Sequence, residues 1–227
     1  MMDYAVPILD SKQNTDRENI KAHRRSVRTE RRRAEILDAA KQIFLNRDFG
    51  SVTIEEIADA AAFSRATIYL YFKSKQEVYT GILLRDLDSL IGGVQDSFNS
   101  DDTVRNNLFR MATSYMNYFR VHPEYFITHS FFFFPGRQDT LPPEAAKMVE
   151  KRLAEGMTAV ENAIRLGIER GEARSVDARA ATLSLWGQWM GIAYLTIAGQ
   201  VGVNGRTMEQ VYSNGIELFL EGVTARG

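Results

Sequence analysis

The sequence predicts an all-α protein, and three features of the chain lead to this fold class. Apolar residues recur at intervals of three and four along the chain, which is the period of an amphipathic helix. Runs in which apolar and polar residues alternate, the pattern of a half-buried strand, are missing. Capping residues, prolines and glycines divide the 227 residues into about nine segments of helical length.

The first expected helix runs from about Thr29 to Arg47. Two capping boxes, Thr53 with Glu56 and Ser74 with Glu77, mark the starts of two further helices. Ser64 is expected to cap the short helix between them, and Asp101 or Asp102 the helix after them. With the starts that Pro123, Pro142-Pro143 and Thr207 provide, the remaining helices are expected at about 53–60, 65–71, 75–98, 101–121, 123–134, 142–170, 177–198 and 207–221.

The composition excludes several classes of protein. Apolar residues make up 44% and charged residues 25% of the chain, the balance of a folded soluble protein rather than a disordered one. The absence of cysteine excludes disulfides, thiolate metal sites and cysteine nucleophiles, and it fits a cytoplasmic protein. Three histidines leave little for metal binding, so neither a metal nor a cofactor is expected. The N-terminal residues lack the apolar core of a signal peptide, and residues 1–22 are interpreted as a mobile tail.

The positive charge is concentrated in the N-terminal third. Residues 21–75 hold twelve Lys and Arg against seven Asp and Glu, on a chain whose formal net charge is −1. Such a basic segment on an acidic body suggests contact with a polyanion.

The same segment contains two short helices joined by a tight turn, the pattern of a helix-turn-helix. The small residues Ala58 and Ala61 stand where the two helices are expected to cross, and Ile57, Phe63 and Ile68 are the expected apolar anchors. The second helix has a largely polar start, made of Ser64, Arg65, Ala66 and Thr67.

The sequence of this segment resembles a known family. Thr53, Ile57 and Ala58, followed by FSRATIYLYFKSKQE from Phe63 to Glu77, resemble the signature of TetR-type (tetracycline-repressor-like) transcriptional regulators. The resemblance covers about residues 29–80. It implies a three-helix DNA-binding domain at 23–74, a larger helical effector-binding and dimerisation domain at 75–227, and double-stranded operator DNA as the partner.

The resemblance also assigns roles to residues. Arg65, Ala66 and Thr67 would lie, after Ser64, on the base-facing start of the recognition helix, where an arginine can grip guanine and a methyl group can meet thymine. Candidate contacts to the phosphate backbone are Thr53, Tyr69, Tyr71, Lys73 and Lys75. Alternatives stay open: the tyrosines can be packing residues, Thr53 only a cap, and the lysines solvated charges.

A run of basic residues precedes the first expected helix. Lys21 to Arg33 contains seven Lys and Arg and one acidic residue, Glu30. Arg24, Arg25 and Arg28 are expected to contact phosphates or the minor groove, as extended basic arms do. The alternative is a solvated tail.

Two positions depart from the family pattern. The family usually has glycine at the end of the first helix, where Asp48 stands, and aspartate tolerates the left-handed conformation better than most residues. The turn of the helix-turn-helix usually has glycine where Ala62 stands, and alanine there is expected to cost about 1 kcal/mol of strain.

The C-terminal body is rich in aromatic residues at helical spacing. An aromatic stripe can be core, and it can also line a pocket for an apolar or aromatic effector. The candidate pocket residues are Tyr115, Phe119, Phe126, Trp186 and Trp189, with His129 or Gln188 as polar partners.

No charged residue occurs from Ala180 to Gly205. The stretch is long enough for a membrane span, and Gly187 and Gly191 form a close-approach motif of membrane helices. Its six polar residues favour a buried helix at a subunit interface instead, with no membrane as partner. In the family that the chain resembles, the last two helices of each subunit pair in a homodimer, which here would be about 177–198 and 207–221.

The function expected from these features is a ligand-responsive DNA-binding repressor that a small apolar or aromatic effector releases from its operator. The alternative is a DNA-binding regulator without a small-molecule effector, gated by a protein or acting as an activator. An enzyme is not expected, because no catalytic serine motif, phosphate-binding glycine loop or metal-ligand spacing occurs.

Overall fold

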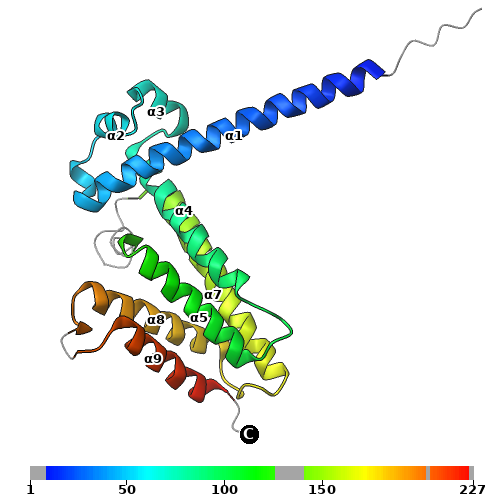
Figure 1. Ribbon diagram of the computed structural model, residues 1–227, viewed down its shortest axis with the longest axis vertical. Coiled ribbons are helices and arrows are strands. Elements are labelled where there is room, and N and C mark those ends of the chain that lie inside the picture. The colour runs from blue at the N-terminus through cyan, green and yellow to red at the C-terminus, as the bar shows by residue number, and fades with distance from the viewer. Residues whose placement is uncertain (1–8, 126–140, 203–204, 225–227) are drawn as a thin grey trace, which may run out of the picture. The chain divides into compact units, whose positions relative to one another are not determined.

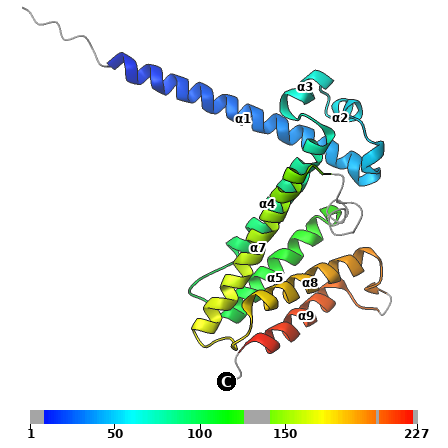
Figure 2. The ribbon, with the colours of Figure 1, turned by 180° about the vertical axis from the view of Figure 1, so that it is seen from behind.

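The computed structural model describes residues 9–125, 141–202 and 205–224, with side chains from Asn19 onward. Within these residues every regular element is helical, and Figures 1 and 2 show them from opposite sides. The elements are α1 (Leu9–Asn46), η1 (Phe49–Ser51), α2 (Ile54–Ala60), α3 (Arg65–Tyr71), α4 (Lys75–Asp96), α5 (Val104–Val121), α7 (Pro143–Glu169), α8 (Ala178–Ile197) and α9 (Met208–Val223). The expected all-α fold is confirmed.

The chain forms two compact units, Met1–Tyr79 and Thr80–Gly227. In the first unit α1 contacts α2, and α2 contacts α3. Ile36 of α1, Ile57 of α2 and Ile68 of α3 are each fully buried. These three residues belong to the apolar faces that the helical period predicted, so burial of one side chain from each helix holds the small unit together.

In the second unit α5, α7, α8 and α9 pack against one another, and α8 and α9 run side by side in both views (Figures 1 and 2). Glycine permits one close approach: a Cβ at Gly167 of α7 would lie 2.6 Å from the Cβ of Val104 in α5. The carboxylate of Glu172 accepts the Val104 N–H at 2.6 Å, which joins the end of α7 to the start of α5.

Some helix boundaries differ from the expected ones. The first helix begins at Leu9, twenty residues before Thr29, because neither proline nor glycine interrupts the chain between Pro7 and Gly50. Thr103, rather than Asp101 or Asp102, caps α5: its side chain accepts the Asn106 N–H. The helix expected at 123–134 lies largely outside the described residues.

The capping signals are largely confirmed. Complete capping boxes start α2, with Thr53 and Glu56, and α9, with Thr207 and Gln210. Before α4 only half of the expected box forms. Ser74 Oγ accepts the Glu77 N–H at 3.2 Å, but the Glu77 carboxylate accepts from the N–H of Lys73, one residue further back, at 2.6 Å.

The two positions that depart from the family pattern behave differently. Ala62, in the turn between α2 and α3, has φ +55°, so alanine does adopt the left-handed conformation for which glycine is preferred. Asp48 has φ −61° and ψ 140°, which is extended backbone. Asp48 therefore needs no tolerance of the left-handed conformation, because the chain leaves α1 through an extended residue into η1.

None of the described helices is both long and apolar enough to cross a membrane. Polar residues such as Thr182 and Gln188 interrupt the run of apolar residues within α8. The side chain of Thr182 is fully buried, and its hydroxyl donates to the carbonyl of Ala178 at 2.8 Å. Packing against α7 and α9 thus accounts for part of the low charge of α8.

Candidate functional site

The start of α3 presents polar side chains to solvent. Ser64, Arg65 and Ala66 are exposed and Thr67 is half-buried. Ser64 caps the helix by accepting the Thr67 N–H at 3.1 Å, and Ile68 anchors it from beneath with no exposed surface. The four residues predicted to face the bases therefore lie together on one accessible helix end, which is the geometry that major-groove readout requires.

Arg65 is held by two neighbours. A guanidinium nitrogen lies 2.5 Å from a carboxylate oxygen of Glu55 in α2. A second nitrogen donates to the Tyr69 hydroxyl at 3.4 Å, and the guanidinium carbon lies 5.5 Å from the centre of the Tyr69 ring. The Tyr69 hydroxyl and the Glu55 carboxylate both raise the pKa of Arg65. Sequence reasoning missed Glu55, because only the crossing of α2 and α3 brings it to Arg65.

Thr53 stands exposed at the N-terminus of α2. Its hydroxyl accepts the Glu56 N–H at 3.2 Å, and Glu56 forms an ion pair of 2.5 Å with Arg47. Hydrogen bonds from Arg47 and Thr53 lower the pKa of Glu56 to about 2. The capping role of Thr53 is thus confirmed. The acidic residues Glu55 and Glu56 in this first turn would repel a phosphate bound at the helix N-terminus. Each of them is paired with an arginine, Glu55 with Arg65 and Glu56 with Arg47.

Lys75 points into the protein. Its ammonium group donates to the carbonyl of Phe49 at 2.7 Å and to that of Val52 at 2.6 Å. It also lies 4.5 Å from the centre of the Phe49 ring. Partial burial lowers the pKa of Lys75. This geometry directs the ammonium to backbone carbonyls of its own unit, whereas the resemblance implied a DNA phosphate.

The rest of α3 offers further contacts. Tyr69 is exposed, Tyr71 is half-buried, and Lys73, just beyond the helix, is exposed. Leu70 is 80% exposed because it lies about half a turn from buried Ile68, on the opposite face of α3. Sequence reasoning did not single out this residue. Arg33 of α1 fixes the end of the helix by donating to the Tyr71 carbonyl at 2.7 Å.

The basic run of residues 21–33 is part of α1 rather than an extended arm. Arg24, Arg25 and Arg28 are exposed along this helix. Arg31 pairs with Glu35 one turn later at 3.0 Å. The three arginines predicted to contact DNA are therefore displayed at fixed helical intervals, and the expectation of an extended arm is wrong.

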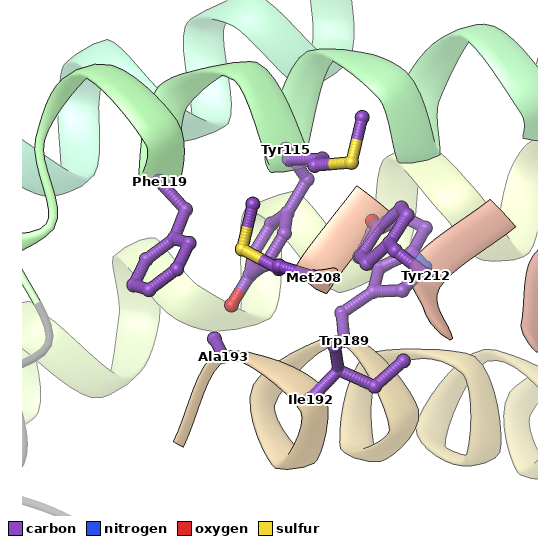
Figure 3. Close-up of a pocket in the computed structure, with 8 residues that line it drawn as sticks. Tyr115, Phe119, Trp189, Ile192, Ala193, Met208 and Tyr212 are labelled. Atoms are coloured by element: carbon purple, nitrogen blue, oxygen red, sulfur yellow. The ribbon is translucent and has the colours of Figure 1, made fainter. Parts of the chain in front are cut away.

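An aromatic pocket lies in the second unit, between α5, α8 and α9. Figure 3 shows Tyr115 and Phe119 of α5 facing Trp189, Ile192 and Ala193 of α8. Met116, Met208 and Tyr212 complete the lining. The ring centres of Tyr115 and Trp189 are 5.0 Å apart, and the pocket leaves no space for a water molecule.

The other predicted effector residues are placed differently. Trp186 lies beside the pocket, its ring centre 5.7 Å from that of Tyr115. Gln188 turns to α9 and donates to the carbonyl of Gly215 at 3.1 Å. Phe126 and His129 lie outside the described residues. Sequence reasoning missed five lining residues, because only the packing of α5, α8 and α9 brings them together: Met116, Ile192, Ala193, Met208 and Tyr212.

Among the described residues, no group of three or more His, Cys, Asp or Glu could hold a metal ion.

Comparison with known proteins identifies the first unit. Residues 36–82 match the model of the bacterial regulatory proteins of the tetR family. The chain is 32% identical over 87 residues to the transcriptional activator FasR of Mycolicibacterium smegmatis, covering 38% of this chain and 40% of FasR. It is 34% identical over 83 residues to the transcriptional repressor KstR2 of Rhodococcus jostii, covering 37% of this chain and 41% of KstR2. The matches thus span about two fifths of the length of these relatives.

Solved structures extend the likeness to the fold of the described chain. A tetR-family regulatory protein from Rhodococcus RHA1 superposes with a TM-score of 0.71 at 18% identity, covering 86% of this chain and 98% of that one. KstR2 of Mycobacterium tuberculosis superposes with a TM-score of 0.64 at 20% identity, over 86% and 96% of the two chains. These relatives are transcription regulators rather than enzymes. Residues 36–82 thus carry the DNA-binding module of the tetR family of bacterial regulatory proteins, and the described chain shares its fold with solved proteins of that family.

Proposed function

We propose that this chain is a sequence-specific DNA-binding transcriptional regulator that reads its operator with the start of α3. The exposed polar helix end of Ser64, Arg65, Ala66 and Thr67 carries this proposal, because it lies inside the segment that matches the family model. An arginine there can donate two hydrogen bonds to guanine, and the methyl groups of Ala66 and Thr67 can meet thymine.

Contacts to the phosphate backbone would position the helix without specifying sequence. Thr53, Tyr69, Tyr71 and Lys73 flank the start of α3 within the first unit, and Arg24, Arg25 and Arg28 are exposed on α1. Each phosphate that such a residue neutralises releases counterions and steepens the salt dependence of binding.

The regulator acts as a homodimer through α8 and α9. Both helices expose large apolar side chains: Leu183, Tyr194, Leu195 and Ile197 on α8 and Leu218 on α9. Gly187 and Gly191 lie exposed on α8, where they would let a second helix approach closely. A dimer presents two copies of α3, which can read two half-sites one turn of DNA, about 34–36 Å, apart.

The mode of action is repression relieved by a small apolar or aromatic effector in the aromatic pocket. The helix α4 belongs to both units, Lys75–Tyr79 to the first and the remainder to the second, so it is the covalent route from pocket to recognition helix. An effector shifts the equilibrium between DNA-binding and released conformations only by its difference in affinity for the two. Action in the cytoplasm, where the DNA lies, follows from this role.

Selection of bound sequences from random double-stranded DNA tests the proposal. We expect one enriched inverted repeat, and an extract of cell metabolites to lower the enrichment. The absence of any enriched sequence would remove the DNA-binding function. Enrichment that no extract alters would favour the alternative regulator without a small-molecule effector. One relative is named an activator and another a repressor, so a reporter gene behind the selected operator determines the sign of regulation.

A further inference from the structure

One residue that lines the aromatic pocket, Trp189, carries a fully buried polar group without a hydrogen bond among the described residues. Trp189 is 1% exposed, and its indole Nε1–H has no hydrogen-bond acceptor among the residues that the structure describes. The neighbouring Tyr212 differs, since its hydroxyl donates to the carbonyl of Ala112 at 2.8 Å. Figure 3 shows Trp189 rising from α8 toward Tyr212, between α5 and α9.

A buried donor without an acceptor destabilises the protein, because it has lost its hydrogen bond to water and gained none. The pocket leaves no space for a water molecule to supply the acceptor. An indole N–H can only donate. A ligand that satisfies it must therefore bring an oxygen or nitrogen acceptor into apolar surroundings.

The remaining lining is mostly apolar, apart from the hydroxyl groups of Tyr115 and Tyr212. Met116 of α5 and Met208 of α9 both line the pocket, and methionine side chains repack readily around irregular shapes. Because the pocket leaves no space even for a water molecule, a ligand must part α5 from α8 and α9 as it enters. Such an opening changes the packing of α8 and α9, the helices proposed to pair in the dimer.

We propose that Trp189 selects, among apolar effectors, those that carry a carbonyl oxygen, which accepts the Trp189 Nε1–H inside the aromatic pocket. This inference rests on the proposed effector site and names its ligand class: an apolar or aromatic body with one acceptor. A hydrocarbon of the same shape would displace the same side chains but leave the indole N–H unpaired, so the pocket discriminates between the two.

Two probes that differ only at this acceptor test the inference. Heptanophenone and 1-phenylheptane share the phenyl ring and the alkyl chain, and only the ketone carries an oxygen. Equilibrium dialysis against the full-length protein, with bound probe measured by gas chromatography, gives both dissociation constants. We expect the ketone to bind about 3- to 10-fold more tightly, the ratio that one net hydrogen bond provides.

Two variants separate the tryptophans. Trp189→Phe removes the donor and should bring the ratio of the two dissociation constants to about 1. Trp186→Phe, beside the pocket, should preserve it. A ratio near 1 in the wild-type protein, or a preference that survives Trp189→Phe, would overturn the inference while leaving the effector site in place. Binding of neither probe would remove the apolar effector site itself, and DNA selection by the same protein tests the DNA-binding function separately.

A spectroscopic measurement needs no variant to fold. In protein labelled with ¹⁵N-tryptophan, the two indole N–H groups give two signals. Heptanophenone should move one signal downfield, as a new hydrogen bond does, and 1-phenylheptane should not. Equal shifts with both probes would contradict the proposed hydrogen bond.

Discussion

The ammonium group of Lys75 lies 2.6 Å from the carbonyl oxygen of Val52 and so ties the first turn of α4 to the residues that lead into α2. The neighbouring Phe49 packs in a cluster with Phe44 and Tyr79, with ring centres 5.0–5.6 Å apart. Lys75 thus joins the start of α4 to the end of η1. The α2 cap at Thr53 follows directly after Val52.

This relationship predicts different outcomes for two lysines. Lys75→Met should lower the thermal midpoint and weaken binding to every DNA sequence, because methionine cannot donate to the carbonyls of Phe49 and Val52, while the slope of log K against log salt stays unchanged. Lys73→Met, at an exposed position, should leave the thermal midpoint unchanged and reduce the slope by about 0.9 for each phosphate that the lysine neutralises. Fluorescence anisotropy at several salt concentrations measures both slopes. A reduced slope for Lys75→Met would restore its phosphate role.

Arg65 and Glu55 are expected to act in opposite directions. Arg65→Ala should lower the ratio of operator to non-specific affinity about 10-fold or more, because alanine cannot donate the two hydrogen bonds to guanine. Glu55→Gln should raise operator affinity about 2- to 5-fold, because the Arg65 guanidinium then has no ion pair with Glu55 to break before it binds the base. Binding to an operator with each base pair substituted in turn measures both effects.

The double variant Arg65→Ala with Glu55→Gln provides the control for this pair. If Glu55 acts through Arg65, the double variant should have nearly the same operator preference as Arg65→Ala alone. If Glu55→Gln raised operator affinity equally with Arg65 and with Ala at position 65, Glu55 would act only by repelling the DNA phosphates.

Ala62 predicts a stabilising substitution. Ala62→Gly should raise stability by about 1 kcal/mol, or the thermal midpoint by about 2–4 °C, because glycine adopts φ +55° without strain from a Cβ. The adjacent Ala61 has φ −81°, so Ala61→Gly should lower stability instead, since glycine there only adds freedom to the unfolded chain. Thermal unfolding of both variants checks the contrast, and a loss of stability in Ala62→Gly would show that the turn is not strained.

The capping box of α2 predicts a dependence on pH. The pKa of Glu56 falls from 4.5 in the unfolded chain to about 2 in the folded protein. Its contribution to stability is therefore fully present above pH 4.5 and is lost as pH falls toward 2. Unfolding of the wild type and of Glu56→Gln between pH 6 and pH 2.5 should show a difference that shrinks on acidification. A difference independent of pH would remove the carboxylate as its cause.

The dimer proposal predicts the effect of a bulky residue on α8. A Cβ at Gly187 meets no atom within 4 Å beyond its chain neighbours and the nearby backbone of α8, so Gly187→Leu should leave the protomer folded and keep a second helix from approaching. Analytical ultracentrifugation should find a dimer for the wild type and a monomer for the variant, with unchanged helical content by circular dichroism. Leu183→Gln, at an exposed position of α8, provides a milder second test. Dimers of unchanged affinity in both variants would place the interface elsewhere.

The sequence was informative where one local rule determines the structure. Thr53, Ser64 and Thr207 were predicted as caps and do cap their helices, because a hydroxyl and an amide three residues apart are always close at a helix start. The same local reasoning failed at Leu9–Thr29. Neither proline nor glycine occurs there, so the helix continues through residues 9–22 of the segment interpreted as a mobile tail.

The sequence by itself determined the helical period, the two short helices of the basic segment and the exposed polar start at Arg65, because each depends on residues close together in the chain. Only the tertiary structure decided that Glu55 meets Arg65, that Lys75 turns inward to Val52, and that Tyr212 and Met208 join Tyr115 and Trp189. These contacts depend on the angles and registers at which helices cross. Those angles result from the packing of many side chains at once, which no single stretch of sequence specifies.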